Sequence, residues 1–573
     1  MIRWNTGMNR IYSKSDVIKM IVSLGIPLVY IFAVWKVTGL YFETNDDRVI
    51  AEILSGTLTG RPEAHTVFLN YFLSCLLSLL YHVSGQISWY GCMFVLCHFA
   101  IYAALLYSIW PQKKSVLEYI FCIGIVCCFS LVNIYLTSVV QFTSTAALLA
   151  VTGYVCLILQ KDFKRGWWFF FFFELAAFLL RSEAMLMVLP VGGYAYAGLC
   201  LADQSIGKRE QCQKIGRVIL SIGIVVVIGF LGNLIGYHGK EWGAYTRFNK
   251  ARAELFDYSG YSAYEEVKPI LDKYDVTQTE YEAFYRYVIL DDKVSAECVE
   301  ELAEYAESRQ KKELDVIDLA GQVWRPDRAA EYLKTEQVTV SRAVWLSILL
   351  WIFLWRKFYL LIPLSGIAFS KTVVWGYLLY RGRLPLRITN PLFACEILLI
   401  VTLFAWDYLR QENDRKQKIF AASVFAVFAL CSISAGKMQY HQAVRANEWQ
   451  DLYMQGLVDI QSYCRENPDN RYLLDCGSFG YYTGSVFETR IYGSQNYVYT
   501  GNWFSKSPVL RRHLEEYFAG GGEEVYFIIL ETEDVWESPG VAFLTEKFGV
   551  PPTLVDQITV SHGGNYLVLY FGK

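Results

Sequence analysis

Two adjacent aspartates, Asp46 and Asp47, follow the first long apolar run of the chain, in the segment 43–48 (ETNDDR). Two carboxylates this close repel each other, so one pKa is expected to rise into the range that suits a general base. Glu43 is near enough to join them around a divalent cation, and Arg48 completes the charged cluster, although this spacing is not specific for a metal. The alternative is that these residues have no catalytic role and end a membrane span because charged side chains favour water. For an isolated pair of aspartates this is the commoner case.

A second set of charged residues is the cluster Arg381, Arg383 and Arg387, which separates the apolar runs 358–380 and 388–408. Short loops on the outer side of a membrane usually lack such clusters, and the topology expected below places this loop outside. Arginine binds phosphate through forked hydrogen bonds, so the cluster predicts a phosphate site. Contact with lipid headgroups explains the cluster equally well, and an error in the expected topology is a third explanation.

Lys371 and Glu396 lie inside these two apolar runs. Each is about ten residues from the connecting loop, which corresponds to a depth of roughly 15 Å at about 1.5 Å per helical residue. Antiparallel neighbours at matched depth can pair and so offset the cost of burying each charge. An ion pair is the favoured interpretation, and Lys371 as a phosphate ligand is the alternative.

Arg181 interrupts the apolar run 167–201, where the sequence reads Arg-Ser-Glu at positions 181–183. The interruption predicts a turn, and the expected topology puts that turn outward, level with the aspartate pair. Arg181 is therefore a candidate ligand for a donor phosphate. It could as easily cap its own helix or pair with Glu183.

The elements that must position these residues are membrane-spanning helices. Hydrophobic residues make up 54% of the chain and charged residues 19%, and the mean hydropathy of +0.26 is too high for an ordinary soluble domain. The apolar residues also come in blocks of membrane length. The net charge of −3 provides no basic field, so no nucleic-acid partner is expected.

Basic residues before the first span, among them Arg3, Arg10 and Lys14, predict a cytoplasmic amino terminus. The run 66–82 is short for a span, which needs about twenty residues. Treating it as a surface helix leaves the later Lys/Arg clusters inside, as the positive-inside rule requires. The sequence then predicts about eleven spans. They are 17–40, 88–110, 116–135, 142–160, 166–180, 184–200, 217–237, 342–355, 358–380, 388–408 and 419–436.

The expected fold class is an all-α polytopic membrane protein with an extracytoplasmic α/β domain at its carboxyl end. An amphipathic stretch predicts a helix at 446–464. Apolar runs bounded by Gly, Asn and acidic residues predict buried strands at 472–474, 525–530 and 567–571. The predicted parts are a transmembrane module at 1–237 with an outward loop at 43–65 and a surface helix at 66–82, a loop domain at 238–341, transmembrane helices at 342–436 and the α/β domain at 437–573.

Within the loop domain, residues 296–312 predict a helix. The run Arg247, Lys250 and Arg252 is interleaved with aromatic residues. This pattern is typical of an amphipathic segment that lies on lipid headgroups.

The order of these elements resembles the GT-C superfamily of membrane glycosyltransferases, which includes the protein mannosyltransferases and the aminoarabinose transferase that modifies lipid A. In that superfamily the first outward loop carries an acidic residue at the active site, and a His-Pro-Pro type motif introduces the surface helix. Here Arg-Pro-Glu-Ala-His, residues 61–65, stands at that place. The resemblance covers roughly the first 240 residues by topology, and it implies that Asp46 or Asp47 is the base and that His65 lies near the site.

The function expected from this resemblance is inverting transfer of a sugar from a polyprenyl-phosphate donor to a glycan, lipid or protein acceptor at the outer face. Its partners are the donor, the acceptor and membrane lipids. No cofactor is certain, and a divalent cation is the one candidate. A flippase for lipid-linked oligosaccharides is an alternative, disfavoured by the scarcity of intramembrane charges and the lack of a repeat. A non-enzymatic receptor with the carboxyl-terminal region as its binding module is another.

Overall fold

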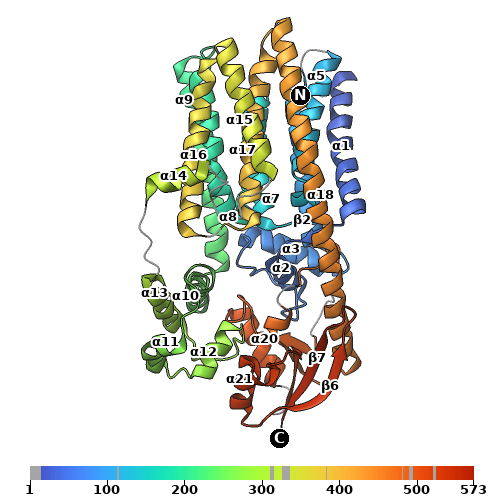
Figure 1. Cartoon of the computed structure of the whole chain (residues 1–573), viewed down its shortest axis with the longest axis vertical. Coiled ribbons are helices and arrows are strands. Elements are labelled where there is room, and N and C mark those ends of the chain that lie inside the picture. Colours follow the sequence, from blue (N-terminus) through green and yellow to red (C-terminus); the bar gives the residue numbers. More distant parts are fainter. Residues whose placement is uncertain are drawn as a thin grey trace, which may run out of the picture.

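A computed structural model of the chain describes residues 14–111, 115–309, 315–324, 336–382, 384–479, 482–488, 495–519 and 524–572. A bundle of long helices forms one end of the molecule, and a sheet with short helices forms the other (Figure 1). Within those ranges, nine helices are long and apolar enough to cross a membrane. The protein is therefore a largely helical polytopic protein of membrane type, because in lipid a helix satisfies its own backbone hydrogen bonds.

The long apolar helices account for most of the predicted spans. They are α1 (Lys14–Thr38), α4 (Trp89–Ile109), α7 (Phe142–Leu159), α8 (Phe163–Ala202), α9 (Lys208–Gly236), α15 (Glu336–Trp355), α16 (Leu361–Arg381), α17 (Leu386–Arg410) and α18 (Arg415–Glu466). The predicted span 116–135 corresponds to a shorter apolar helix, α5 (Val116–Val132). The predicted spans 166–180 and 184–200 both lie in α8, so the number of eleven crossings stays a prediction.

The long helix α8 is divided at Arg181, whose φ of −159° and ψ of 101° are extended and not helical. Both halves contact the same residue of α7, Tyr154. The ring of Phe170 lies 4.9 Å from the Tyr154 ring, and Gly192 lies so close to that ring that a Cβ would collide with it. The turn predicted at residues 181–183 is confirmed, and it brings Arg181 to the end of the bundle.

The last helix, α18, continues for 52 residues from the bundle into the carboxyl-terminal region (Figure 1). The sequence predicted a span at 419–436 and a separate helix at 446–464, with a domain boundary at 437. The structure instead has one continuous helix through position 437, which Gly436 does not interrupt. Asn447 fixes the helix where it leaves the bundle, since its amide Nδ2 donates to the Thr38 carbonyl and to Ser138 Oγ.

The carboxyl-terminal region contains a five-stranded sheet of order β4-β3-β5-β7-β6. Strand β3 (Tyr472–Leu474) is parallel to both of its neighbours, β4 (Tyr497–Tyr499) and the central strand β5 (Val525–Leu530). Strand β7 (Asn565–Phe571) is antiparallel to β5 and β6 (Thr553–Thr559). Strands β3, β5 and β7 lie where the sequence predicted buried strands. Strand β6 escaped prediction because it is an exposed edge strand without an apolar run.

Between α9 and α15 the chain forms short helices. They are α10 (Lys240–Glu254), α11 (Tyr264–Leu271), α12 (Gln278–Tyr285), α13 (Ala296–Arg309) and α14 (Val316–Trp324). Helices α11 and α12 lie on the side of the sheet, and α14 lies against α16 of the bundle (Figure 1). The helix predicted at 296–312 is α13. Arg247 of α10 pairs with Glu297 and Glu300 of α13, at 3.0 and 2.6 Å, so α13 occupies the side of α10 that was expected to face headgroups.

Helices α2 (Asn45–Ser55) and α3 (Tyr71–Val83) lie between the bundle and the sheet (Figure 1). The predicted surface helix at 66–82 corresponds to α3. The start of α2 is fixed by β1 (Tyr41–Phe42), which pairs with β2 (Val139–Val140). The carboxyl-terminal region adds a third segment, since the Phe42 N–H donates to the Gly484 carbonyl at 3.1 Å. Three distant parts of the chain therefore position the predicted site.

Candidate functional site

Asp46 and Asp47 stand in the first turn of α2 and point in different directions, because successive residues of a helix are about 100° apart. Asp47 is fully buried. Its Oδ1 accepts a hydrogen bond from the Tyr90 hydroxyl at 2.8 Å, and its Oδ2 accepts one from Thr44 Oγ1 at 3.0 Å. Burial raises the pKa of Asp47 well above its usual range. Asp47 thus fastens α2 to α4, and it is not accessible to a substrate.

Asp46 is only partly buried, and the charges of three arginines act on it. Burial raises the pKa of Asp46, and the positive charges of Arg387, Arg252 and Arg181 oppose that rise. These three side chains come from the first turn of α17, from the last turn of α10 and from the turn in α8. One partly buried carboxyl group therefore lies within electrostatic range of three guanidinium groups and of a second carboxyl group, that of Asp257.

Glu43 belongs to the same group of charges. Burial raises the pKa of Glu43 to about 7, and the nearby Arg387 lowers it. The Glu43 Oε2 atom makes no hydrogen bond with the part of the chain that the structure describes. No three His, Cys, Asp or Glu side chains form a metal-binding group in that part. With Asp47 turned toward Tyr90, the predicted cation site is reduced to Glu43 and Asp46.

The arginines of the predicted cluster have different surroundings in the structure. Arg387 makes no hydrogen bond or ion pair with any residue of the described ranges, and its charge acts on Glu43 and Asp46. Arg381 instead pairs with Glu254 at 3.0 Å and lies 4.0 Å from the centre of the Tyr258 ring. The prediction of Arg383 as a ligand lies outside the described residues.

Lys371 forms the ion pair that the matched depths predicted. Its Nζ lies 2.8 Å from Glu396 Oε1. The same oxygen accepts hydrogen bonds from Ser341 Oγ at 3.1 Å and from Trp345 Nε1. The side chain of Lys371 is buried in this network, so the alternative prediction of a phosphate ligand has no support in its contacts.

Arg181 lies over two aromatic rings at the edge of the site. Its guanidinium carbon is 5.1 Å from the centre of the Phe68 ring and 5.4 Å from that of Phe142. It also pairs with Glu183 at 3.1 Å, an exposed contact of small energetic value. The residue before Phe68 is Val67, which has a φ of +66°. Such a conformation is strained for a β-branched residue, and strain of this kind is often found at functional sites.

Arg252 is the site residue that sequence reasoning placed wrongly, because it was expected on lipid headgroups. It is 5% exposed. Its Nε and Nη2 donate to Asn249 Oδ1 at 3.0 Å, and its Nη1 lies 3.5 Å from the Tyr287 hydroxyl. Tyr245 and Phe248 are buried on the same face of α10, at a spacing of three and four residues. This spacing is visible in the sequence, and it places Arg252 on the buried face of α10 with Tyr245 and Phe248.

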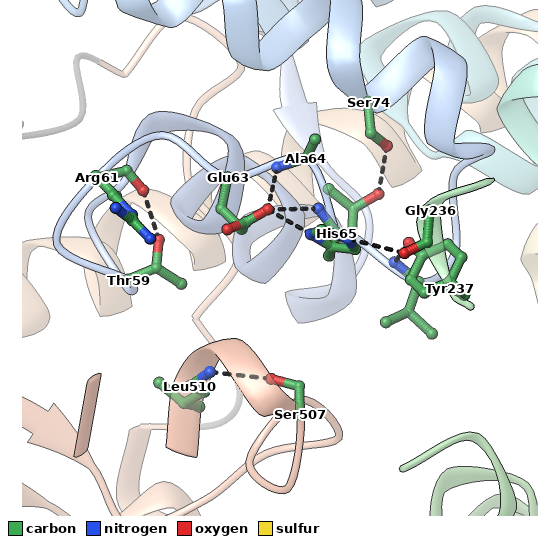
Figure 2. A network of polar contacts seen from close by, with 12 residues as sticks. Thr59, Arg61, Glu63, Ala64, His65, Ser74, Gly236, Tyr237, Ser507 and Leu510 are labelled. Carbon is green, nitrogen blue, oxygen red and sulfur yellow. Dashed lines mark hydrogen bonds and ion pairs between the residues drawn. The ribbon is translucent and has the colours of Figure 1, made fainter. Parts of the chain in front are cut away.

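His65 is held by contacts to Glu63 in its own loop and to Gly236 at the end of α9 (Figure 2). Its Nδ1 lies 2.5 Å from Glu63 Oε1 and its Nε2 lies 3.0 Å from the Gly236 carbonyl oxygen. Although burial raises the pKa of Glu63, hydrogen bonds from His65 and from the Ala64 N–H lower it overall. The His65 ring also stacks on Trp242 at 4.6 Å. Both ring nitrogens are engaged inside the protein, so His65 joins α2, α3 and α9 and offers no atom to a substrate.

Arg48 faces the carboxyl-terminal region. It is 3% exposed, its Nε lies 3.6 Å from Glu52 Oε1, and its guanidinium lies 5.5 Å from the centre of the Tyr499 ring. Two positions along a helix correspond to a rotation of about 200°. Arg48 therefore lies on the opposite side of α2 from Asp46, and it docks α2 onto the sheet.

Comparison of the chain with protein-family models, with curated proteins and with solved structures finds no match. What the protein does must therefore be inferred from its own residues.

Glu43 makes the stability of the protein depend on pH. Its pKa rises from its ordinary value of 4.5 to about 7 on folding, so the folded state binds the proton more tightly than the unfolded state does between these values. The free energy of unfolding then falls as the pH rises through this window. We expect Glu43→Gln to flatten the dependence of Tm on pH between about 4.5 and 7, measured in detergent by thermal unfolding.

The matched control is Glu533→Gln, which neutralises an exposed carboxyl group. This variant should keep the pH dependence of the parent protein. A Glu43→Gln variant with an unchanged profile would show that Glu43 has no raised pKa.

Proposed function

We propose that the protein is a membrane glycosyltransferase that moves a sugar from a polyprenyl-phosphate donor to an acceptor hydroxyl at the outer face of the membrane. The observation that carries the proposal is the position of Asp46, which is accessible in the first turn of α2 and faces Arg387, Arg252 and Arg181. A base and a set of phosphate-binding cations are the two components that this reaction needs.

The proposed reaction is a single displacement at the anomeric carbon. Asp46 takes the proton of the acceptor hydroxyl, and the acceptor oxygen forms a bond to the anomeric carbon as the bond to the phosphate oxygen breaks. The phosphate leaves with the electron pair and carries the polyprenyl chain. Attack from the side opposite the leaving group inverts the configuration, as the resemblance to the GT-C superfamily implies.

The three arginines differ in their freedom to bind phosphate. Arg387 is free of partners within the described ranges, and Arg181 has only an exposed partner. These two are the proposed phosphate ligands, since a planar guanidinium matches phosphate oxygens in pairs. Arg252 is anchored by Asn249 and Tyr287, so it is proposed to balance the charge of Asp46. A raised pKa suits Asp46 to a base that operates near neutral pH.

The proposed orientation has the amino terminus in the cytoplasm and the carboxyl-terminal α/β domain outside. Helices α2 and α3 then lie at the outer surface, with the apolar face of α3 in contact with lipid. A divalent cation held by Glu43 and Asp46 would add a further positive charge beside the leaving phosphate. The acceptor is a glycan, a lipid or a protein with a hydroxyl group that can reach Asp46.

Asp46→Asn and Asp47→Asn should separate catalysis from folding. Removing a general base lowers kcat by about 10²–10⁴-fold, and we expect this loss for Asp46→Asn with little change in Tm. Asp47→Asn replaces one of two buried acceptors by a donor, so it should lower Tm and leave the kcat of the folded protein within about tenfold. Release of polyprenyl phosphate from a panel of polyprenyl-phosphate sugars, measured in membranes, tests both. Full activity of Asp46→Asn would reject Asp46 as the base.

Arg387→Gln and Arg381→Gln form a matched pair, because both residues flank the same loop and only one faces Asp46. We expect Arg387→Gln to lower kcat/KM by about 10²-fold, the effect of losing one charge-stabilising donor. Arg381→Gln removes an ion pair with Glu254 and should change kcat/KM by less than about fivefold. Equal losses in the two variants would contradict the assignment of the phosphate to Arg387.

A further inference from the structure

A polar cleft of about 890 Å³ lies between the loop after α2 and the carboxyl-terminal domain. Thr59, Gly60 and Arg61 form its wall on the loop side, and α20 (Pro508–Ala519) forms the other with the residues that precede β3 and β4. Figure 2 shows the loop with Thr59 and Arg61 above the segment that carries Ser507 and Leu510 at the start of α20. The volume is in the range of ligand-binding pockets, which is about 300–1,000 Å³.

Three arginines line the cleft. Arg61 comes from the loop, and Arg512 comes from α20. Neither guanidinium forms a hydrogen bond or an ion pair with the residues that the structure describes. A third arginine, Arg471, lies 5.8 Å from the centre of the Tyr517 ring at the base of the cleft. Three guanidinium groups from separate elements are a pattern that binds carboxylate or phosphate.

The remaining side chains of the cleft suit a ligand that is rich in hydroxyl groups. Glu516 and Asp469 accept hydrogen bonds, and Asn470 and Gln495 both donate and accept them. The two carboxylates can accept hydrogen bonds from hydroxyl groups, which a simple anion such as phosphate does not supply in number. Tyr517 adds an aromatic surface. We propose that the cleft binds an oligosaccharide that carries acidic groups, with Arg61 and Arg512 as ligands of those groups.

The two walls of the cleft are in direct contact at one point. Gly60 has a φ of +75°, and a Cβ on it would lie 3.3 Å from the His513 ring. Glycine is the residue that adopts this conformation without strain. Burial lowers the pKa of His513, so this ring is neutral at pH 7 and adds no charge to the site. The contact keeps Arg61 and Arg512 at opposite sides of one preformed cleft.

The cleft is separate from the reaction site. Asp46 is in the first turn of α2, which ends at Ser55. The first residue that lines the cleft, Thr59, lies four residues beyond that end. Eleven helical residues span roughly 16 Å at about 1.5 Å per residue. Binding in the cleft therefore needs neither Asp46 nor a donor, and the inference does not rest on the proposed transfer reaction.

The experiment measures equilibrium binding of trigalacturonate to the full chain in detergent, by isothermal titration calorimetry, with maltotriose as a neutral trisaccharide and inorganic phosphate as an anion without sugar. We expect trigalacturonate to bind at least tenfold more tightly than either of the other probes. Its affinity should fall as the salt concentration rises. Arg61→Gln and Arg512→Gln should each weaken binding at least fivefold without a change in Tm.

The matched control is Arg511→Gln. Arg511 is the neighbour of Arg512 on α20, but it pairs with Asp292 at 3.0 Å on another side of the helix, so its loss should leave binding unchanged. Asp46→Asn should also leave binding unchanged, which separates the failure of this inference from that of the proposed reaction. Equal binding of trigalacturonate and maltotriose, binding of phosphate alone, no saturable binding, or equal effects of Arg511→Gln and Arg512→Gln would each overturn the proposal.

Discussion

The electrostatic attraction between Asp46 and three arginines is the interaction on which the chemistry proposed for the site depends. Guanidinium groups that converge in a partly enclosed place repel one another, and each loses contact with water. The negative charge of Asp46 opposes this repulsion, although the raised pKa of Asp46 shows that the cost of burial exceeds the attraction. Because the arginines come from α8, α10 and α17, the ends of three distant elements must meet at the first turn of α2. The proposed reaction at Asp46 therefore requires the helices that carry these arginines to be in place.

The position of α2 depends in turn on contacts with the carboxyl-terminal region. Strand β1 pairs with β2 and with the segment at Gly484, and Arg48 packs on the Tyr499 ring. The continuous helix α18 connects the bundle to the sheet without a flexible linker. The carboxyl-terminal region therefore helps to position α2, which carries Asp46. It also forms one wall of the cleft beside Arg61.

The features that the sequence predicted well are those that follow from local pattern. The turn at Arg181 follows from charges in an apolar run, and the pair of Lys371 with Glu396 follows from matched depth in neighbouring spans. The features that it missed depend on packing between distant elements. Nothing local reveals that Arg381 would meet Glu254 while Arg387 faces Asp46. In the same way, the division of labour between Asp46 and Asp47 depends on Tyr90, which is 43 residues away.

The most direct test of this account asks whether the acidic and basic halves of the site face the outside of the cell. Asn45→Cys and Leu386→Cys place thiols at exposed positions beside Asp46 and Arg387, and native Cys212 is exposed at the start of α9, at the opposite end of the bundle. In intact cells, a membrane-impermeant maleimide should label the two new thiols and should label Cys212 only after permeabilisation. Labelling of only one new thiol from outside, or of neither, would contradict the account.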